Sequence, residues 1–392
     1  MNKEFHSMEK ICQFFSPKKI VINKNIVNKV GEEVQTLGGK KAIIVTDPGI
    51  VSAGFTETVE KSLHEQKIKF DIFDKVVPEP PAHLVDECGA LIREGSHDIV
   101  IGLGGGSSLD VAKGAAIMAT NPGAILDYVG IDLVPNAALP KILIPTTAGT
   151  GSEVTKSLIV ADERENTKKS VSSYFALSEV AMLDPMLTLT MPPEVTANTG
   201  MDALVHAIEA YVAATTTPFA QILAIEAISL IGYNLPMSYS KGNNETARYN
   251  MLLAAALAGL AFASGRLGAV HALSYIIGTD YHLSHGRSNA IMLPHVMNFN
   301  KTGNLAKFAD IAQALGENIA GLSMYEAADK SVESIKKLLD SVQIPYRLTQ
   351  YGISQKDLPK LVEGGMKQAR LFITNPRDLT EEDVTGIYKG AF

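Results

Sequence analysis

The sequence predicts two domains, an α/β domain built on a parallel sheet followed by an all-helical domain. In the first half, short β-branched runs alternate with helical patterns, which is typical of a parallel sheet covered by helices. From about residue 189 onward, almost every segment has helical spacing. At 392 residues the chain is also longer than one ordinary domain. We therefore expect domains at 1–188 and 189–392, packed closely around a cleft because no low-complexity linker separates them.

The expected strands of the first domain are short runs rich in valine and isoleucine. They lie at 18–22, 40–47, 69–74, 97–106, 140–147, 156–163 and 180–185, and we expect them to form one sheet. Helical patterns fall between the strands, for example at 29–39 and 82–95. Both of these end at glycine, a common helix stop.

The second domain is expected to consist of helices separated by glycine, proline and asparagine. The expected helices cover 191–212, 218–235, 244–264, 304–316 and 325–342. The pair Pro192 and Pro193 suits the first turn of a helix. The most apolar run, 251–265, is shorter than the roughly 20 residues that a bilayer span requires, so we interpret it as a buried helix.

Composition excludes several classes of protein. A hydrophobic share of 46% with 20% charged residues is typical of a packed globular protein. The net charge of −7 and the lack of a long basic run make nucleic acid an unexpected partner. Two cysteines are too few for a disulfide framework or a thiolate zinc site. The first ten residues lack the apolar core of a secretory signal, so we expect a cytoplasmic protein that does not bind membranes.

Three adjacent glycines follow the fourth expected strand. In "IGLGGGSSLDVAKGAAI", residues 101–117, Gly104, Gly105 and Gly106 allow the backbone to approach a phosphate, and Ser107 can cap the helix behind them. Free amides and the helix dipole favour an anion there. The motif is not a P-loop, because the Gly-Lys-Ser/Thr ending is absent. A tight turn without a ligand is the simpler alternative, but the hydroxyls beside three glycines favour a ligand.

A second turn rich in hydroxyls, "PTTAGTGSEVT", follows the next strand at 145–155. Thr146, Thr147 and Thr150 lie beside two glycines there. Two phosphate-type turns at the ends of sheet strands suit a dinucleotide better than a mononucleotide. In the usual dinucleotide fingerprint the ribose-binding acid lies about 20 residues downstream of the glycines. Here the best candidate, Asp47, lies upstream, at the end of an earlier strand.

Four side chains of the second domain suit a metal ion. Asp202 and His206 are four residues apart on a strong helical pattern, so they share one helix face. His271 and His285 lie fourteen residues apart, across the turn-like segment 278–281. Any one histidine is more often a core or surface residue than a ligand, but four such donors in the most apolar region are costly to bury without a partner. One carboxylate and three imidazoles suit zinc or ferrous iron, and the sequence does not decide between them.

These motifs together resemble the iron-containing, or group III, alcohol dehydrogenase family, in order and over nearly the whole chain. The resemblance rests on "GGGSSLDVAK", "PTTAGTGSEVT", "GMDALVHAIEAY", "HALSYIIGTDYHLSHG" and "NAIMLPHVMNFN". It implies a nucleotide-binding α/β domain, a helical metal domain and a homodimer. It also implies NAD(H)- or NADP(H)-dependent interconversion of small alcohols and aldehydes, with the metal acting as a Lewis acid on the substrate oxygen.

The resemblance also implies roles for individual residues. The expected metal ligands are Asp202, His206, His271 and His285. The expected cofactor contacts are Gly104, Gly105, Gly106, Ser107, Asp110, Thr146, Thr147, Thr150 and Lys168. Asp47 matches the acid that holds the adenosine ribose, and its charge would repel a 2′-phosphate, so NAD(H) is favoured over NADP(H). Phe262 matches a residue of the substrate pocket, and we place Ser157 and Arg266 on the substrate side as well.

The chain departs from the family pattern at several positions. Many relatives carry a histidine, often assigned to proton relay, where this chain has Tyr275, and His282 is a possible substitute for it. Glu79 replaces an asparagine that often meets the cofactor. Arg266 and Arg287 lie close in sequence to metal ligands, so they could bind an acidic group of a short aldehyde. Alternatively, each pairs with an acid such as Asp280 or faces solvent.

Three other interpretations of the function stay open on the sequence alone. A dehydroquinate synthase-like lyase shares this architecture but returns the hydride within one turnover. A glycerol dehydrogenase-type enzyme usually has fewer protein ligands to zinc. A binding module without enzymatic activity would leave the joint presence of two phosphate-type turns and a metal set unexplained.

Overall fold

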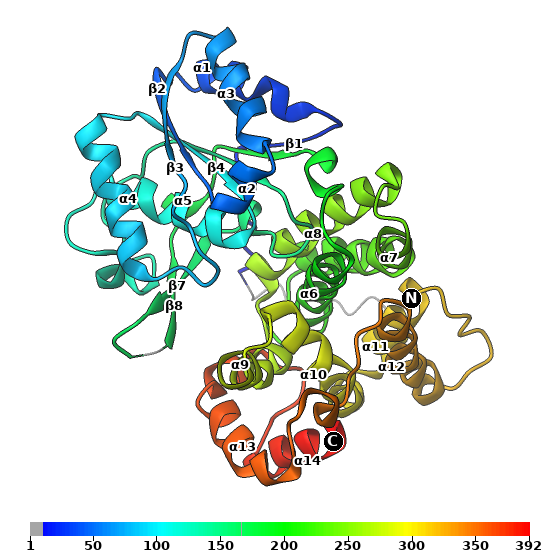
Figure 1. The fold of residues 1–392 in the computed structure, drawn as a ribbon. Helices are drawn as coiled ribbons and strands as arrows, with labels where there is room; N and C mark the ends of the chain where they lie inside the picture. Colours follow the sequence, from blue (N-terminus) through cyan, green and yellow to red (C-terminus); the bar gives the residue numbers. More distant parts are fainter. Residues whose placement is uncertain (1–10, 166) are drawn as a thin grey trace. The chain divides into compact units, whose positions relative to one another are not determined.

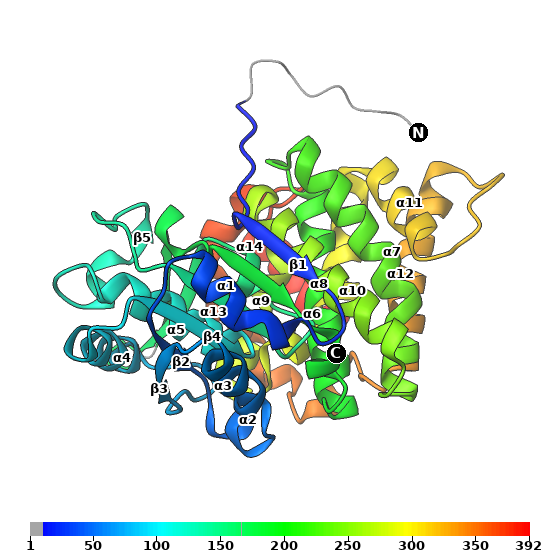
Figure 2. The ribbon, with the colours of Figure 1, turned by 90° about the horizontal axis from the view of Figure 1, so that it is seen from above.

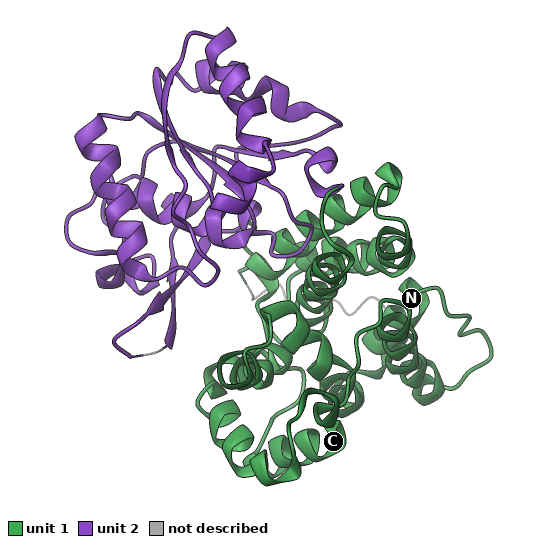
Figure 3. Ribbon diagram, in the orientation of Figure 1, with its two compact units in different colours: residues 1–14, 190–392 green, residues 15–189 purple. Residues whose placement is uncertain are grey.

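The computed structural model describes residues 11–165 and 167–392. Contacts between residues divide the chain into two compact units (Figure 3). One unit, the α/β unit, runs from Phe15 to Leu189. The other, the helical unit, contains Thr190–Phe392 and the described residues before Phe15.

The α/β unit is built on a six-stranded sheet in the order β1-β9-β6-β4-β2-β3, with β1 at one edge (Figures 1 and 2). Every strand pairs in parallel with its neighbours. The strands are β1 (Lys19–Ile22), β2 (Lys41–Val45), β3 (Lys69–Phe73), β4 (Ile99–Gly104), β6 (Lys141–Pro145) and β9 (Val180–Leu183). The predicted parallel sheet is therefore confirmed. The register pairs Gly104 with Pro145 at the carboxyl ends of the parallel strands β4 and β6. The two hydroxyl-rich turns, which follow these strands, therefore begin side by side.

One predicted strand lies outside this sheet. Residues 156–163 were expected to extend it, but β7 (Ser157–Asp162) belongs to a separate three-stranded sheet with β8 (Thr167–Ser172) and β5 (Gly130–Ile131). β7 pairs with β8 in antiparallel fashion. Buried and exposed residues alternate along β7, whereas every residue of β4 is buried. That alternation is typical of a sheet covered on one face only, which explains the different location.

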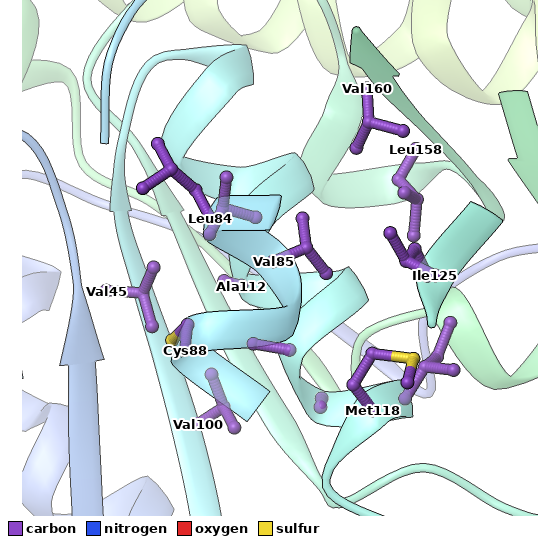
Figure 4. Close-up of a cluster of buried hydrophobic side chains, with 14 of the residues drawn as sticks. Val45, Leu84, Val85, Cys88, Val100, Ala112, Met118, Ile125, Leu158 and Val160 are labelled. Atoms are coloured by element: carbon purple, nitrogen blue, oxygen red, sulfur yellow. The ribbon is translucent and has the colours of Figure 1, made fainter. Parts of the chain in front are cut away.

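Helices cover both faces of the six-stranded sheet and form two cores. They are α1 (Val30–Thr36), α2 (Pro48–Ser52), α3 (Phe55–Glu65), α4 (Ala82–Gly95) and α5 (Gly106–Met118), with short 3-10 turns at Ile26–Lys29, Ile125–Tyr128, Ser152–Val154, Tyr174–Ala176 and Pro185–Thr188. One core joins α4 and α5 to the sheet and includes the buried Cys88 (Figure 4). The other joins α1 and α3 to the opposite face, around residues such as Ile44. The central strands β2, β4, β6 and β9 are buried almost throughout, and burial on both faces makes their sequences almost continuously apolar.

The helical unit contains nine α-helices within its described residues (Figure 1). They are α6 (Pro193–Val212), α7 (Pro218–Ser240), α8 (Glu245–Gly265), α9 (Ala269–Tyr281), α10 (His285–Asn300), α11 (Leu305–Ala314), α12 (Met324–Ser341), α13 (Leu358–Met366) and α14 (Glu381–Ala391). Short 3-10 turns lie at Lys301–Gly303, Leu348–Tyr351, Gln355–Asp357 and Ala369–Thr374. The fold of an α/β unit followed by a helical unit is the one that the sequence predicts.

Two expectations for these helices need correction. Residues 278–281 are not a turn, because they form the last helical turn of α9, and the chain reverses only at His282, which has a left-handed φ of 53°. Helix α7 continues to Ser240, five residues beyond the predicted end, and carries Pro236 inside it. Helices α7 and α8 are each long and apolar enough to cross a bilayer, but here they pack against each other and against α6. Tertiary packing thus overrides the local stop signals.

Candidate metal centre

Helix α6 brings the first two candidate ligands to one buried face. The helix begins at Pro193, whose missing N–H is one of the groups that the first helical turn leaves unbonded in any case. Asp202 and His206 lie one turn apart near the middle of α6, and their residues are only 4% and 5% exposed. A carboxylate and an imidazole at this spacing project from the same side of the helix.

The other two histidines come from α9 and α10, which follow α7 and α8 in the chain. His271 lies in the first turn of α9, and His285 is the first residue of α10. One ligand atom from each of His271, His285, Asp202 and His206 lies within 4.8 Å of the ligand atoms of the other three. Three residues of this set are buried, while the His285 side chain is 46% exposed. The structure therefore brings together all four predicted ligands, with one side open.

Glycine makes the close approach of α10 to α6 possible. A Cβ on Gly286 would lie 2.2 Å from the carbonyl oxygen of Asn198 and 3.2 Å from Cβ of Asp202. Only a residue without a side chain fits between the two backbones at this point. Because Gly286 follows His285 directly, this contact places the His285 ring beside the Asp202 carboxylate.

The donor set fits a divalent ion. Atoms at the corners of a tetrahedron around an ion at about 2.1 Å are separated by about 3.4 Å. The Nε2 atoms of His285 and His206 lie 3.7 and 4.0 Å from Oδ1 of Asp202, which is close to that separation before any ion draws them together. Burial disfavours the charged form of Asp202, but the three histidines outweigh this effect and hold the pKa of Asp202 below its ordinary value. One carboxylate with three imidazoles is a ligand set typical of zinc or ferrous iron.

A second buried carboxylate, which the sequence reasoning missed, holds one of the histidines. Oε2 of Glu209 lies 2.6 Å from Nδ1 of His271. The same carboxylate accepts backbone N–H bonds from Gly268 at 3.0 Å and Val270 at 2.6 Å. Burial disfavours charge on both side chains, but their attraction dominates, so the pKa of Glu209 is lowered and the pKa of His271 is raised. Spacing could have indicated Glu209, because it lies seven residues after Asp202 and therefore on the same face of α6.

Asn289 of α10 is the second residue that the sequence reasoning missed. Its Nδ2 donates to Oδ1 of Asp202 at 2.8 Å and lies 3.2 Å from Nε2 of both His271 and His285. The Oγ of Ser274 donates to Oδ1 of Asn289. Asn289 is fully buried, so these bonds fix the orientation of its amide and, through it, of the Asp202 carboxylate.

Aromatic contacts complete the surroundings of the ligands. The rings of His206 and His271 stack with centroids 5.0 Å apart, and the Phe262 ring lies 4.6 Å from the His206 ring. The structure thus places Phe262, a predicted substrate residue, directly beside a candidate ligand. Tyr275 is half-buried on α9, one turn after His271, whereas His282 is exposed just past the end of that helix.

The two arginines have different surroundings. Arg287 donates from Nε to Asn198 at 2.8 Å and pairs through Nη2 with Glu194 at 3.1 Å, so its guanidinium already has protein partners. Arg266 is exposed and is the C-cap residue of α8. Its φ of 72° and ψ of 169° are backbone angles that residues other than glycine rarely adopt. Among the described residues, no ion pair joins the Arg266 side chain. Asp280, which was considered as an arginine partner, pairs with a lysine of α13 at 2.7 Å.

In the α/β unit, the two hydroxyl-rich turns lie against each other. Gly104 ends β4 with φ 145°, and Gly106 begins α5, so the free amides of a helix start lie at this turn. A Cβ on Gly106 would lie 2.7 Å from the Thr150 side chain, and one on Gly105 would lie 3.6 Å from the Thr147 side chain. The backbone of the glycine turn thus lies beside the side chains of Thr147 and Thr150.

Asp47 also lies at this glycine turn. Its Oδ1 accepts N–H bonds from Gly49 and Ile50 at the start of α2, and its Oδ2 accepts a bond from Ser108 at 3.1 Å. A Cβ on Gly104 would lie 3.3 Å from Oδ2 of Asp47. The upstream acid and the glycine motif, which are far apart in sequence, therefore meet in space.

Other predicted cofactor and substrate residues bond to the protein itself. Asp110 accepts bonds from the Ser152 hydroxyl at 2.5 Å and from the backbone N–H of Ile159 at 3.0 Å, so it ties the second turn to α5. Ser157 donates its hydroxyl to Ser172 at 3.1 Å. Lys168 pairs with Glu79 at 2.5 Å, which links two residues of the predicted cofactor region. Two predicted cofactor residues remain. Ser107 lies in the first turn of α5. Thr146 is buried directly after β6, and its N–H donates to the Gly104 carbonyl at 3.0 Å.

Comparisons with known proteins agree along the whole chain. Residues 17–185 match the family model for iron-containing alcohol dehydrogenase, and residues 196–392 match the C-terminal model of the Fe-containing alcohol dehydrogenase family. Long-chain-alcohol dehydrogenase 1 of Geobacillus thermodenitrificans is 41% identical over 92% of this chain and 91% of the relative. Sulfoacetaldehyde reductase of Bilophila wadsworthia is 35% identical over 96% and 98%. A crystal structure of a 1,3-propanediol oxidoreductase has a TM-score of 0.95 and 38% identity, covering 98% of this chain and all of that one.

The fold, the site and these relatives together define an alcohol dehydrogenase, an oxidoreductase that acts on CH–OH groups. More narrowly, the chain belongs to the iron-containing alcohol dehydrogenase family. The family resemblance predicted from the sequence motifs is therefore confirmed.

Proposed function

We propose that this protein interconverts a short-chain primary alcohol and its aldehyde, using NAD(H) and a divalent metal held by Asp202, His206, His271 and His285. Fe²⁺ is the proposed metal, with Zn²⁺ as the alternative. The observation that carries the proposal is the convergence of one buried carboxylate and three imidazoles within 4.8 Å, with a partly exposed histidine on one side. A substrate oxygen would approach on the open side beside His285, as a fifth ligand, because catalytic zinc sites can expand to five-coordinate.

When both groups are bound, the metal supplies a Lewis acid for the substrate oxygen and the nicotinamide supplies or accepts the hydride. The protein prepares its own side chains for this chemistry. Glu209 holds the proton on Nδ1 of His271, so that the Nε2 lone pair faces the cluster. Asn289 orients the Asp202 carboxylate. The Phe262 ring lies against the His206 ring, so Phe262 is the proposed apolar contact of the substrate.

Proton transfer is assigned first to Tyr275. It lies one helical turn after His271 and is half-buried, whereas His282 is exposed beyond the helix. Its phenolic O–H is a group that can donate a proton to the substrate oxygen when an aldehyde is reduced. Tyr275→Phe should slow reduction at least tenfold, and His282→Gln should have less effect; the reverse order would assign the proton to His282.

The α/β unit is the proposed cofactor unit. The cofactor residues are Gly104, Gly105, Gly106, Ser107, Asp110, Thr146, Thr147, Thr150 and Lys168, with Asp47 at the ribose. The contact between Asp47 and Ser108 at the glycine turn supports this assignment. A carboxylate there disfavours a 2′-phosphate, so NAD(H) is proposed over NADP(H). The helical unit would then supply the metal ligands and substrate residues. The protein is proposed to be cytoplasmic and to act as a homodimer, and light scattering of the purified protein tests the dimer.

A second candidate substrate is a small anionic aldehyde. Two observations favour it: one relative is a sulfoacetaldehyde reductase, and the exposed guanidinium of Arg266 lies four residues after Phe262. Arg287, the other candidate for binding an acid, already bonds to Glu194 and Asn198 and is no longer proposed for this role. Ser157 remains a proposed substrate residue on the α/β unit.

One panel of assays tests these proposals. The purified protein, stripped with a chelator and reloaded with Fe²⁺ or Zn²⁺, is given propanal, octanal, sulfoacetaldehyde and succinic semialdehyde with NADH or NADPH. The highest kcat/KM is expected for propanal with NADH and Fe²⁺. A higher value for sulfoacetaldehyde would favour the anionic substrate. Asp202→Ala and His271→Ala should abolish metal uptake and turnover while NADH binding persists; turnover in either variant would contradict the proposed metal site.

A further inference from the structure

Glu209 joins three parts of the helical unit that the sequence separates. It lies on α6, on the same face as Asp202 and His206, and is only 5% exposed. Its carboxylate reaches the loop between α8 and α9 and the first turn of α9, where it meets the backbone N–H groups of Gly268 and Val270. Among the described residues, no lysine or arginine pairs with Glu209. Its carboxylate faces the α9 N-terminus and lies 2.6 Å from Nδ1 of His271.

The loop that Glu209 holds is conformationally strained. Arg266 has φ 72° and ψ 169°, a region that is nearly restricted to glycine. Such a conformation persists only where the surroundings hold it. Two residues later, a Cβ on Gly268 would lie 3.3 Å from Oε1 of Glu209, so the carboxylate is closely fitted against the loop. The bonds from Gly268 and Val270 therefore fix the path of the chain that leads into His271.

We infer that Glu209 is a positioning residue that couples the conformation of the α8–α9 loop to metal binding at His271. The inference rests on the proposed metal site. Oε2 of Glu209 takes part in both contacts, with Nδ1 of His271 at 2.6 Å and with the N–H of Gly268 at 3.0 Å. A change that loosens the loop must therefore also loosen the imidazole. Conversely, an ion held by Nε2 of His271 keeps the ring, and through it the loop, in place.

A purely structural role would have different consequences. If Glu209 only capped α9, its loss would lower the stability of the protein and leave the metal affinity of the folded state unchanged. A positioning residue changes the metal affinity of the folded protein as well. Loss of a carboxylate that orients a ligating histidine typically weakens metal binding by about 10- to 100-fold.

The test uses the full-length protein and Zn²⁺, which has no redox chemistry. Zinc affinity is measured by competition with a chelating dye for the unaltered protein, Glu209→Gln and Glu209→Asp. Glu226→Gln, an exposed glutamate of α7, is the matched control. Glu209→Gln should bind zinc at least tenfold more weakly, Glu209→Asp should recover part of that loss because it keeps the charge, and Glu226→Gln should match the unaltered protein.

Amide hydrogen exchange supplies a second test, and its first measurement uses the unaltered protein. In the unaltered protein, zinc should slow amide exchange at Gly268 and Val270, and in Glu209→Gln this slowing should be lost. Zinc affinity of a folded Glu209→Gln within twofold of the unaltered protein would overturn the inference. Should that variant not fold, unchanged exchange at Gly268 and Val270 on zinc loading would overturn it equally. Failure of the unaltered protein to bind zinc or iron would instead refute the proposed metal site, and with it the inference.

Discussion

Replacement of Gly286 by alanine tests whether the approach of α10 to α6 assembles the metal site. The added Cβ would lie 2.2 Å from the backbone carbonyl oxygen of Asn198, and the carbonyl carbon would be only 2.8 Å away. Neither group is the end of a flexible side chain that could move aside. The first turn of α10 must therefore retreat from α6 by about 1 Å to regain ordinary van der Waals contact.

This displacement has two measurable consequences. Overpacking of a closely fitted interior typically costs about 1–3 kcal/mol of the free energy of unfolding. The retreat also carries the His285 ring away from Oδ1 of Asp202, now 3.7 Å from Nε2. Because a binding constellation tolerates errors of only about 0.5 Å, zinc affinity should fall by at least about tenfold, the factor seen when supporting groups of metal ligands are disturbed.

The assay measures urea unfolding of the chelator-treated protein and, separately, zinc affinity by dye competition. Gly386→Ala is the control, because a Cβ there meets no atom within 4 Å on the exposed side of α14. That control should gain about 0.5–1 kcal/mol from helix propensity without any change in zinc affinity. If Gly286→Ala were as stable as the unaltered protein and bound zinc equally well, the proposed role of the α6–α10 contact would be wrong.

Three further predictions follow from other residues. Burial lowers the pKa of His295 from 6.5 to about 4, so the folded protein stays neutral there while the unfolded chain takes up a proton. Stability should therefore fall by about 3 kcal/mol as the pH drops from 6.5 to 4, and urea unfolding of His295→Gln should lack this component. Arg266→Gly should relieve strain and raise stability by about 1 kcal/mol, without loss of kcat/KM for propanal; a loss confined to sulfoacetaldehyde would support the anionic substrate. Asp47→Gly should raise the NADPH-to-NADH ratio of kcat/KM at least tenfold, and an unchanged ratio would remove Asp47 from the ribose site.

The main sheet could be predicted because burial on both faces leaves a clear pattern. Strands such as β4 are apolar at nearly every residue, and α4, which precedes β4, ends at Gly95. β7 shows the limit of that reasoning. Leu158, Ile159 and Val160 read as another buried run, but Ile159 is 40% exposed. In its partner β8 only Val171 is buried, and the other residues are polar. The sequence of β8 therefore lacks the apolar pattern from which a strand, and with it the β7–β8 hairpin, could have been predicted.

The predicted turn at residues 278–281 was wrong for a related reason. Gly278, Thr279 and Asp280 have the composition of a turn, yet they continue the helix. Asp280 pairs with Lys360 of α13 at 2.7 Å, and this contact from a distant segment helps to hold the last helical turn. Local propensity contains no information about such a partner.

The four candidate ligands could be predicted because their residue types are rare in an apolar region. Of their supporting residues, Glu209 could have been placed on the ligand face of α6 from its spacing, but its bonding partners could not have been predicted. Glu209 accepts hydrogen bonds from backbone amides about sixty residues away. Because almost every residue has a backbone amide, the side chains of that segment do not indicate this contact. Asn289 looks like an ordinary helix residue until the packing of α10 against α6 brings its amide to Asp202.

Anomalous diffraction at the iron absorption edge, from crystals of protein reloaded with Fe²⁺, tests the central claim most directly. We expect one strong peak in the helical unit, about 2.0–2.2 Å from a carboxylate oxygen of Asp202 and from one ring nitrogen of each of His206, His271 and His285. A peak elsewhere, or no peak in protein that oxidises alcohol with NAD, would contradict it.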